Sequence, residues 1–221
     1  MNENIEHNSY FETPIYVGYL PELLKNLNKI SDKFINETKK KNEDIIKKRN
    51  KDLKIKINDF GLVHHSVSLI NIPDFKILQD YINRRSLEIL EHMGYDLTGY
   101  NISLIDFWVQ EFAKDGGGYH EGHVHPNSHI SGFYFLKCSD KTSFPIFHDP
   151  RIGKSSIQLP LKNKFEITCG TEQVNYKTKP GTLILFPSFL EHQFPVDLGI
   201  EPFRFIHFNL QAVIKTITGI K

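Results

Sequence analysis

Four of the eleven histidines in this sequence crowd into one short stretch, YHEGHVHPNSH, at residues 119–129. His123 and His125 stand two positions apart, and side chains with this spacing point to the same face of an extended segment. Both imidazoles can therefore converge on one metal ion. Pro126 follows directly, and proline prevents the segment from continuing as a central strand. A mononuclear centre then needs a further ligand from a distant segment, because the local chain cannot surround an ion while leaving open positions.

The best candidate for that distant ligand is His192 in GTLILFPSFLEHQFP, where it follows an apolar strand-like run and a proline turn. Arg204 lies further along the chain, in the aromatic run FRFIHFN. An arginine in such a strand indicates a carboxylate partner, because its planar fork binds a carboxylate in a bidentate manner. Together these residues predict a metal at the mouth of a barrel, with a carboxylate-bearing co-substrate anchored deeper inside.

Other histidines offer alternatives to this ligand set. His120 can replace His123 through the pair in HEGH, although that spacing suits a helix better than a glycine-flanked extended stretch. The cluster can also be a group of exposed loop histidines that face only water. We interpret His129 as a loop residue and His207, on the opposite strand face from Arg204, as structural.

Several further residues have roles that the pattern leaves open. Asp149 closes a strand and caps a turn, or it contacts substrate together with Arg151. Trp108 and Gln110 share one strand face; we expect Trp108 in the core and Gln110 within reach of the pocket. Cys138 and Cys169 have no pairing motif nearby and are interpreted as core thiols.

The elements that must position these residues change character near residue 98. The first part, 1–97, predicts a strand at 13–20, a helix from 21 to about 50, a strand or strand edge at 64–70 and an amphipathic helix at 74–93. Short strand-like runs separated by turn residues fill the second part, 98–213. These runs are ISLIDFWVQEF, ISGFYFLKC, FPIFHD, KFEITC, EQVNYKT, GTLILFP and FRFIHFNLQAV. We expect one domain, 1–221, that is mainly β with α: N-terminal helices packed on a double-sheet core.

Composition excludes several classes of function. The chain has 221 residues, 39% of them hydrophobic, and a formal net charge of +1, so no global charge favours nucleic acid or an acidic membrane. Its basic runs at 39–41 and 47–49 are interleaved with acidic residues and lack aromatic residues for base stacking, which indicates a solvated helix face. Two cysteines are too few for a disulfide framework, and from the pattern of apolar residues we expect neither a signal sequence nor a membrane span. We therefore expect a cytoplasmic protein with no nucleic-acid or membrane partner.

With these residues in place, the sequence resembles the iron(II)- and 2-oxoglutarate-dependent oxygenases, whose fold is a double-stranded β-helix of the jelly-roll or cupin-like kind. More narrowly, it resembles a group marked by an HxH motif before a Ser-Gly-aromatic strand. The resemblance covers roughly residues 100–210. Its matching stretches are HVHPNSHISGFYFL, FHDPR, GTLILFPSFLEH and RFIHFNL.

The resemblance implies that His123, His125 and His192 bind Fe(II), and that Arg204 holds the distal carboxylate of 2-oxoglutarate. Ser131 shares the strand face that lines the co-substrate pocket, while Tyr134 points the other way. The implied reaction consumes O2 and 2-oxoglutarate, releases succinate and CO2, and hydroxylates a substrate.

The main departure from the wider superfamily is His125, because the usual residue at that position is Asp or Glu. A neutral imidazole there leaves the site one unit more positive. Two alternatives stay open: a three-histidine dioxygenase that does not use 2-oxoglutarate, and a non-enzymatic cupin-like metal-binding protein. The substrate, a small molecule or a peptide, is not named by the sequence, and the long N-terminal helix is compatible with a homodimer.

Overall fold

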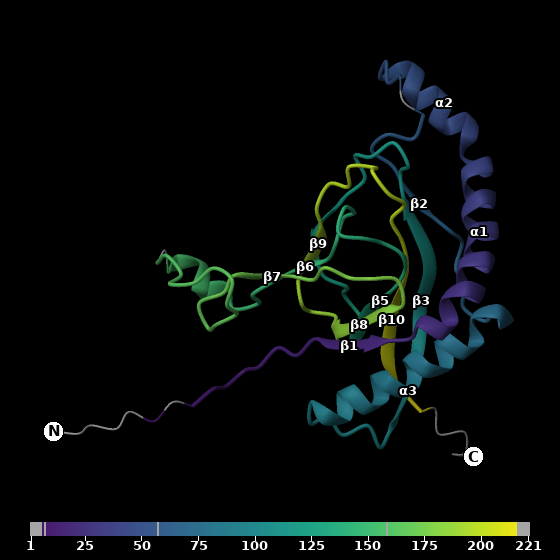
Figure 1. The fold of residues 1–221 in the computed structure, drawn as a ribbon. Coiled ribbons are helices and arrows are strands. Elements are labelled where there is room, and N and C mark those ends of the chain that lie inside the picture. The colour runs from purple at the N-terminus through teal and green to yellow at the C-terminus, as the bar shows by residue number, and fades with distance from the viewer. Residues whose placement is uncertain (1–5, 7, 57, 158, 216–221) are drawn as a thin grey trace, which may run out of the picture.

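Two antiparallel sheets pack against each other in the computed structural model, which describes residues 6, 8–56, 58–157 and 159–215 (Figure 1). The larger sheet has the strand order β1-β8-β5-β10-β3-β2 and the smaller one β4-β9-β6-β7. The strands are β1 Tyr16–Tyr19, β2 Val63–His65, β3 Tyr100–Phe112, β4 His120–His123, β5 Ile130–Lys137, β6 Ile146–His148, β7 Gln173–Asn175, β8 Thr182–Pro187, β9 His192–Phe194 and β10 Arg204–Ile214. The first five and last six residues of the predicted domain, 1–221, lie outside the described residues.

The helices α1 and α3 cover one face of the larger sheet (Figure 1). The helical elements are η1 Pro21–Leu23, α1 Leu24–Lys41, α2 Glu43–Asp52, η2 Pro73–Phe75, α3 Lys76–His92 and η3 Ile152–Ser156. The helix predicted from residue 21 to about 50 is divided at Asn42, whose φ of −93° and ψ of 0° lie outside the helical region. Beyond the end of α3, Gly94 has a φ of 88°, a left-handed conformation that glycine adopts without steric cost.

Two apolar clusters lie on the two faces of the larger sheet, and strand alternation decides which residue joins which cluster. On β10, Ile206 and Phe208 pack with the helices, whereas Phe205 packs between the sheets. On β5, Tyr134 belongs to the helix side and Phe135 to the space between the sheets, as predicted from their alternation. The space between the sheets is dominated by phenylalanine.

Three details of the predicted strands are different in the structure. The run KFEITC at 164–169 forms no strand; it lies in the segment between β6 and β7, which projects from the sheets (Figure 1). Phe165 in this run is 98% exposed. The run has strand-forming residues but no neighbouring strand, and strand propensity alone does not produce a strand. Of the predicted strand at 64–70, only the first residues belong to β2. The short strands β4 and β9, which carry histidines of the cluster, were not predicted.

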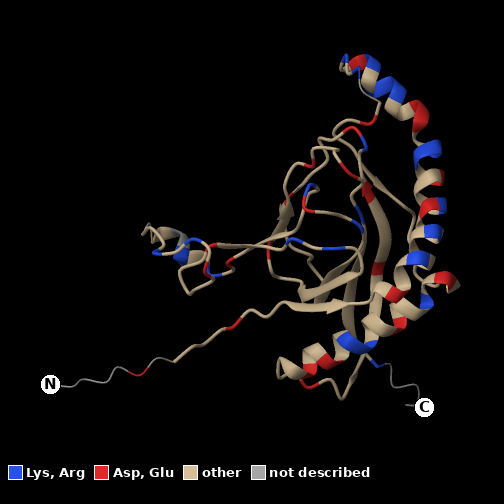
Figure 2. Cartoon of the chain, viewed as in Figure 1, with Lys and Arg blue, Asp and Glu red and all other residues tan. Residues whose placement is uncertain are grey.

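The charges on α1 and α2 are mixed, as the sequence indicates. Figure 2 shows basic and acidic residues interleaved along both helices. Lys47 pairs with Glu43 at 2.6 Å, and Lys39 reaches the sheet and pairs with Glu111 at the same distance. Among the described residues, no helix combines the length and apolar character that crossing a bilayer requires.

Candidate active site

The structure brings the three predicted metal ligands together. His123 ends β4 and is paired with His192 at the start of β9, while His125 follows two residues later on the same chain segment. One ring nitrogen from each of the three lies within 4.8 Å of the others. The Nε2 atoms of His125 and His192 are 3.2 Å apart. Two adjacent short strands, together with the residues that follow β4, thus place three imidazoles around one point.

Backbone carbonyls hold two of these imidazoles in a ligating form. His123 donates from Nδ1 to the carbonyl of Glu121 at 2.7 Å, and His192 donates from Nδ1 to the carbonyl of Leu190 at 3.1 Å. Because Nδ1 carries the proton in both rings, the lone pair is on Nε2 and is available to a metal. The tautomer that these carbonyls select is therefore the one that a metal centre needs.

The third imidazole, that of His125, lies against a buried polar network. Its Nδ1 is 3.5 Å from the amide nitrogen of Asn209, too long a contact to fix a tautomer. Asn209 is itself held, since it donates to Asp106 at 2.9 Å and accepts from the hydroxyl of Ser131 at 2.7 Å. Ser131 is thus fully buried behind the cluster and positions Asn209, rather than lining the pocket as predicted.

Burial keeps two of the three converging imidazoles, those of His125 and His192, neutral. Desolvation, followed by the electrostatic influence of neighbouring histidines, lowers the pKa of His125 to about 4 and the pKa of His192 to about 3. A metal binds the neutral imidazole, so neither ring must lose a proton near neutral pH. Imidazole suits iron, zinc, copper and nickel, and three protein ligands leave open positions. The donor set fits a catalytic metal.

A cavity of about 220 Å³ opens on this cluster. It is lined by His65, Trp108, Gln110, His120, His123, His125, Phe133, His192, Phe194 and His207. Six histidines therefore surround it, and none of the described lining residues is Lys, Arg, Asp or Glu. Gln110 reaches the pocket as predicted, whereas Trp108, which we expected in the core, lines the cavity.

His120, the alternative ligand, is engaged elsewhere. Gln110 donates to its Nε2 at 2.8 Å, and Trp108 donates in turn to the side-chain oxygen of Gln110 at 3.1 Å. The pKa of His120 is lowered to about 4 by burial and by neighbouring histidines. It lines the cavity beside His123 but does not belong to the converging group.

Arg204 does not join the site, and this corrects the sequence prediction. It is buried on the face of β10 that packs against α1, where Nε donates to Glu111 at 2.6 Å and a terminal nitrogen donates to Asp32 at 2.5 Å. Burial alone would raise the pKa of Glu111, but the charges of Arg204 and Lys39 outweigh it and hold that pKa below its usual value. The carboxylate partners that its fork requires are therefore within the chain, not in a ligand.

His207 is the residue that sequence reasoning missed. We expected a structural role for it, yet its ring lines the cavity, with a ring-centroid distance of 4.7 Å to His125. The signal was present in the sequence, because His207 and Arg204 occupy opposite faces of one strand. The prediction that Arg204 faces the interior of the barrel therefore also assigned His207 to the outer face of the strand.

Five other residues named by the sequence lie away from the cavity. The carboxylate of Asp149 accepts from the backbone and the side chain of Arg151 at 3.0 and 2.9 Å, which supports the turn-capping interpretation. His129 is exposed, as expected of a loop residue, and accepts from a backbone N–H at 3.1 Å. Neither cysteine is fully buried: Cys138 is half-buried, with a pKa raised by burial to about 11, and Cys169 is exposed. The interpretation of Cys169 as a core thiol is therefore wrong.

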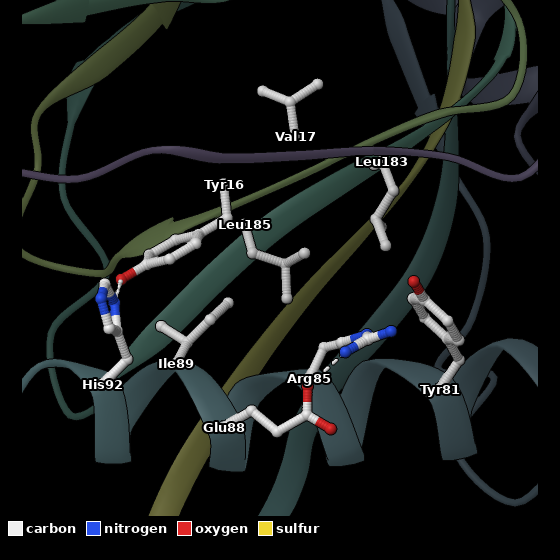
Figure 3. A pocket seen from close by; sticks show the side chains of 10 residues that line it. Tyr16, Val17, Tyr81, Arg85, Glu88, Ile89, His92, Leu183 and Leu185 are labelled. Carbon is white, nitrogen blue, oxygen red and sulfur yellow. Dashed lines mark hydrogen bonds and ion pairs between the residues drawn. The ribbon is translucent and has the colours of Figure 1, made fainter.

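A second cavity, of about 330 Å³, lies between β1 and α3 (Figure 3). Its polar groups satisfy one another: the hydroxyl of Tyr16 lies 3.0 Å from Nδ1 of His92, and Arg85 pairs with Glu88 at 2.5 Å. It does not include the metal-ligating group. The histidine cavity is therefore the candidate active site.

Comparisons with known proteins agree with this geometry. Residues 106–208 match the model of a family described as "Putative 2OG-Fe(II) oxygenase", and this span contains all three converging histidines. No curated protein matches the sequence significantly.

Similar solved structures share the architecture at low sequence identity. AviO1 from Streptomyces viridochromogenes is 10% identical, covers 94% of this chain and 92% of its own, and has a TM-score of 0.57. A prolyl-4-hydroxylase from Pseudomonas putida is 11% identical, with 90% and 93% covered and a TM-score of 0.51. HygX from Streptomyces hygroscopicus, solved with nickel and 2-oxoglutarate bound, is 11% identical, with 90% and 83% covered and a TM-score of 0.50.

These likenesses show the fold, which is a double-stranded β-helix with helices on one face, as predicted. The family match adds the chemistry, because it spans the strands that carry the three imidazoles. The part of the chain that carries the three histidines therefore resembles the 2OG-Fe(II) oxygenases, a family of oxidoreductases that use Fe(II), 2-oxoglutarate and O2.

Proposed function

We propose that this protein is a 2OG-Fe(II)-dependent hydroxylase in which His123, His125 and His192 hold Fe(II) at the mouth of the barrel. The observation that carries the proposal is the convergence of three ring nitrogens within 4.8 Å, two of them on rings already oriented by backbone carbonyls. When bound, Fe(II) supplies the activation of O2 that couples conversion of 2-oxoglutarate to succinate and CO2 with hydroxylation of a substrate.

The chain's own residues orient the reactants and exclude water. The rings of Phe133 and Phe194 form apolar walls beside the histidines, and such walls limit the access of water to the reacting centre. His125 occupies the position of the usual carboxylate, so the protein adds no negative charge to the metal. A dicationic centre surrounded only by neutral ligands attracts an anionic keto-acid more strongly than one that is already partly neutralised.

The proposal extends to location and partners. We propose a cytoplasmic protein that acts on a small molecule or a peptide and has no nucleic-acid or membrane partner, with a long helix, α1, that is compatible with a homodimer. A net charge of +1, the interleaved charges of α1 and α2, and the two unpaired cysteines support this proposal.

The test is an anaerobic titration of purified protein, first with Fe(II) and then with 2-oxoglutarate. We expect a visible charge-transfer band to appear on addition of the keto-acid, and we expect His192→Ala to lose both the iron and the band. His92→Gln, which alters a histidine on α3 outside the cavity, serves as the control and should retain both.

Two results would contradict the proposal in different ways. If iron binds tightly but no band forms, a three-histidine dioxygenase without keto-acid or a metal-binding role replaces it. The lack of Lys and Arg among the described cavity residues is the observation that favours this second candidate. If His192→Ala retains its iron, the assigned ligand set is wrong.

A further inference from the structure

His207 is a buried imidazole that lines the cavity, and its Nε2 has no hydrogen-bond partner among the described residues. Only 3% of its surface is exposed, and its Nε2 contacts no donor or acceptor among the described residues. Its neighbours are flat rings, with centroid distances of 4.6 Å to Trp108, 4.7 Å to His125 and 5.5 Å to Phe133. A buried polar group without a partner is unfavourable and rare in folded proteins, so it points to a ligand that supplies the missing bond.

This position distinguishes His207 from the other buried side-chain atoms that lack a partner among the described residues. Those atoms are Asn28 Oδ1, Ser31 Oγ, Asn83 Oδ1, Ser86 Oγ and His148 Nε2. None of those residues lines the histidine cavity, whereas His207 does. The unsatisfied nitrogen is therefore located beside the proposed metal ligands, where a bound molecule would meet it.

Of the other polar residues of the cavity, His65 is exposed, and the rest are already engaged. Trp108 donates to Gln110, and Gln110 donates to His120, which closes a short chain of hydrogen bonds along one wall. The three metal ligands direct their free nitrogens to one another. His207 is left as the buried donor that a second functional group of a metal-bound molecule can reach.

The charges of the lining residues indicate what that group is. No described lining residue is acidic, so an anion entering the cavity meets no like charge from its walls. No described lining residue is Lys or Arg either, because the guanidinium of Arg204 is on the far side of β10 and is paired with Glu111 and Asp32. An imidazole N–H hydrogen-bonds well to a carboxylate, and such charge-assisted bonds are stronger than bonds between neutral groups.

We propose that His207 binds the distal carboxylate of 2-oxoglutarate, the role that the sequence assigned to Arg204. The proposal rests on the proposed function, since it requires the keto-acid to be held at the three-histidine centre. In this arrangement His207 determines whether the site prefers a dicarboxylate to a keto-acid that has only one carboxylate.

The chain contains a built-in reporter for this binding. Trp108 is its only tryptophan and lies beside His207 in the cavity wall, so its fluorescence should change when the cavity fills. Protein loaded with Zn(II), which imidazoles bind well and which has no redox chemistry, can be titrated in air without turnover. Two keto-acids are compared: 2-oxoglutarate, and 2-oxobutanoate, which lacks the distal carboxylate.

We expect His207→Phe to raise the Kd for 2-oxoglutarate about 10- to 100-fold, the range for losing a hydrogen bond to a charged group. The same variant should leave the Kd values for Zn(II) and 2-oxobutanoate within about twofold, since neither depends on the distal carboxylate. His207→Gln retains an N–H donor and should recover part of the affinity. Arg204→Lys, which keeps the charge on the opposite strand face, is the matched control and should bind 2-oxoglutarate as the wild type does.

Each other outcome overturns the assignment. Equal weakening of both keto-acids by His207→Phe would show a general effect on cavity shape, and unchanged binding of 2-oxoglutarate would show that the carboxylate lies elsewhere. If His207→Phe does not fold, His207→Gln decides the matter, because equal weakening of both keto-acids by that variant would also contradict the proposal. If the zinc-loaded wild type binds no 2-oxoglutarate, the proposed function fails, and with it the assignment of His207.

Discussion

The two faces of β10 bury ionisable residues in opposite ways. On the face toward α1, Arg204 is paired with Glu111 and Asp32, and Glu111 is also paired with Lys39. On the face between the sheets, His207 is equally buried but lacks a partner for Nε2 among the described residues. On the first face the charge of Arg204 is paired with carboxylates of the same chain, whereas on the second face Nε2 of His207 has no such partner among the described residues.

This contrast between the two faces of β10 means that burial alone does not locate a functional site. A buried charge whose bonds are all satisfied by its own chain contributes to the fold, and removing one partner is costly. A buried imidazole left unsatisfied beside converging metal ligands indicates a bound molecule. The two faces should therefore respond differently to substitution: one in stability, the other in binding.

The largest expected effect is on metal affinity. It concerns the three converging histidines on the side of β10 that lies between the sheets, which we call the binding face. His192→Ala removes one of the three proposed ligands, so we expect metal affinity to fall at least about 1,000-fold, since metal binding energy is distributed over few ligands. Metal content after dialysis and a competitive zinc titration measure this change. His129→Gln, a loop histidine outside the cavity, should leave affinity unchanged; a His192→Ala protein with full metal content would disprove the ligand assignment.

On the face of β10 toward α1, which we call the structural face, Arg204→Met should lower the stability of the fold. It leaves the buried carboxylate of Glu111 without its main partner, so we expect the free energy of unfolding to fall by about 3–5 kcal/mol, as measured by urea denaturation. The double variant Arg204→Met/Glu111→Gln should recover part of this loss. If Arg204→Met instead weakens 2-oxoglutarate binding at unchanged stability, the two faces have been assigned the wrong roles.

The sequence predicted much of the fold and the convergence of the three histidines, and the reason lies in local pattern. His123 and His125 share a face because of strand alternation, and the position of His192 after an apolar run placed it at a strand end. The inward face of β10 was not predictable in the same way, because Arg204 stands between two phenylalanines and both faces of the strand are apolar. Only the helices that cover one face decide which side is the barrel interior.

The short strands show a second limit of local pattern. β4 and β9 have four and three residues, which are too few for alternation to be recognised in the sequence. The run at 164–169 has the composition of a strand but pairs with no neighbour among the described residues. Whether a segment becomes a strand depends on a partner that the local sequence does not contain.

The histidines of the binding face should also make the metal-free protein sensitive to acid. Burial lowers the pKa of His125 to about 4 and of His192 to about 3, while unfolded histidine has a pKa of about 6.5. The unfolded chain therefore binds more protons below pH 6.5, so stability falls as the pH decreases from about 6.5 toward 4. Urea midpoints across this range measure the slope. His192→Phe should give a shallower slope, and an unchanged slope would mean that other groups dominate the acid response.

The smallest effect is expected in the polar network behind His125. Ser131→Ala removes the hydroxyl that donates to Asn209, so the amide that faces His125 becomes less restrained. We expect zinc affinity to fall about tenfold, at the low end of the range for residues that orient a ligand, and stability to fall by about 1 kcal/mol. Ser86→Ala on α3 is the matched control, since its equally buried hydroxyl has no hydrogen-bond partner among the described residues and its loss should cost neither property. If both serine variants behave alike, Ser131 only fills space, and the restraint on His125 comes from the loop between β4 and β5 rather than from β10.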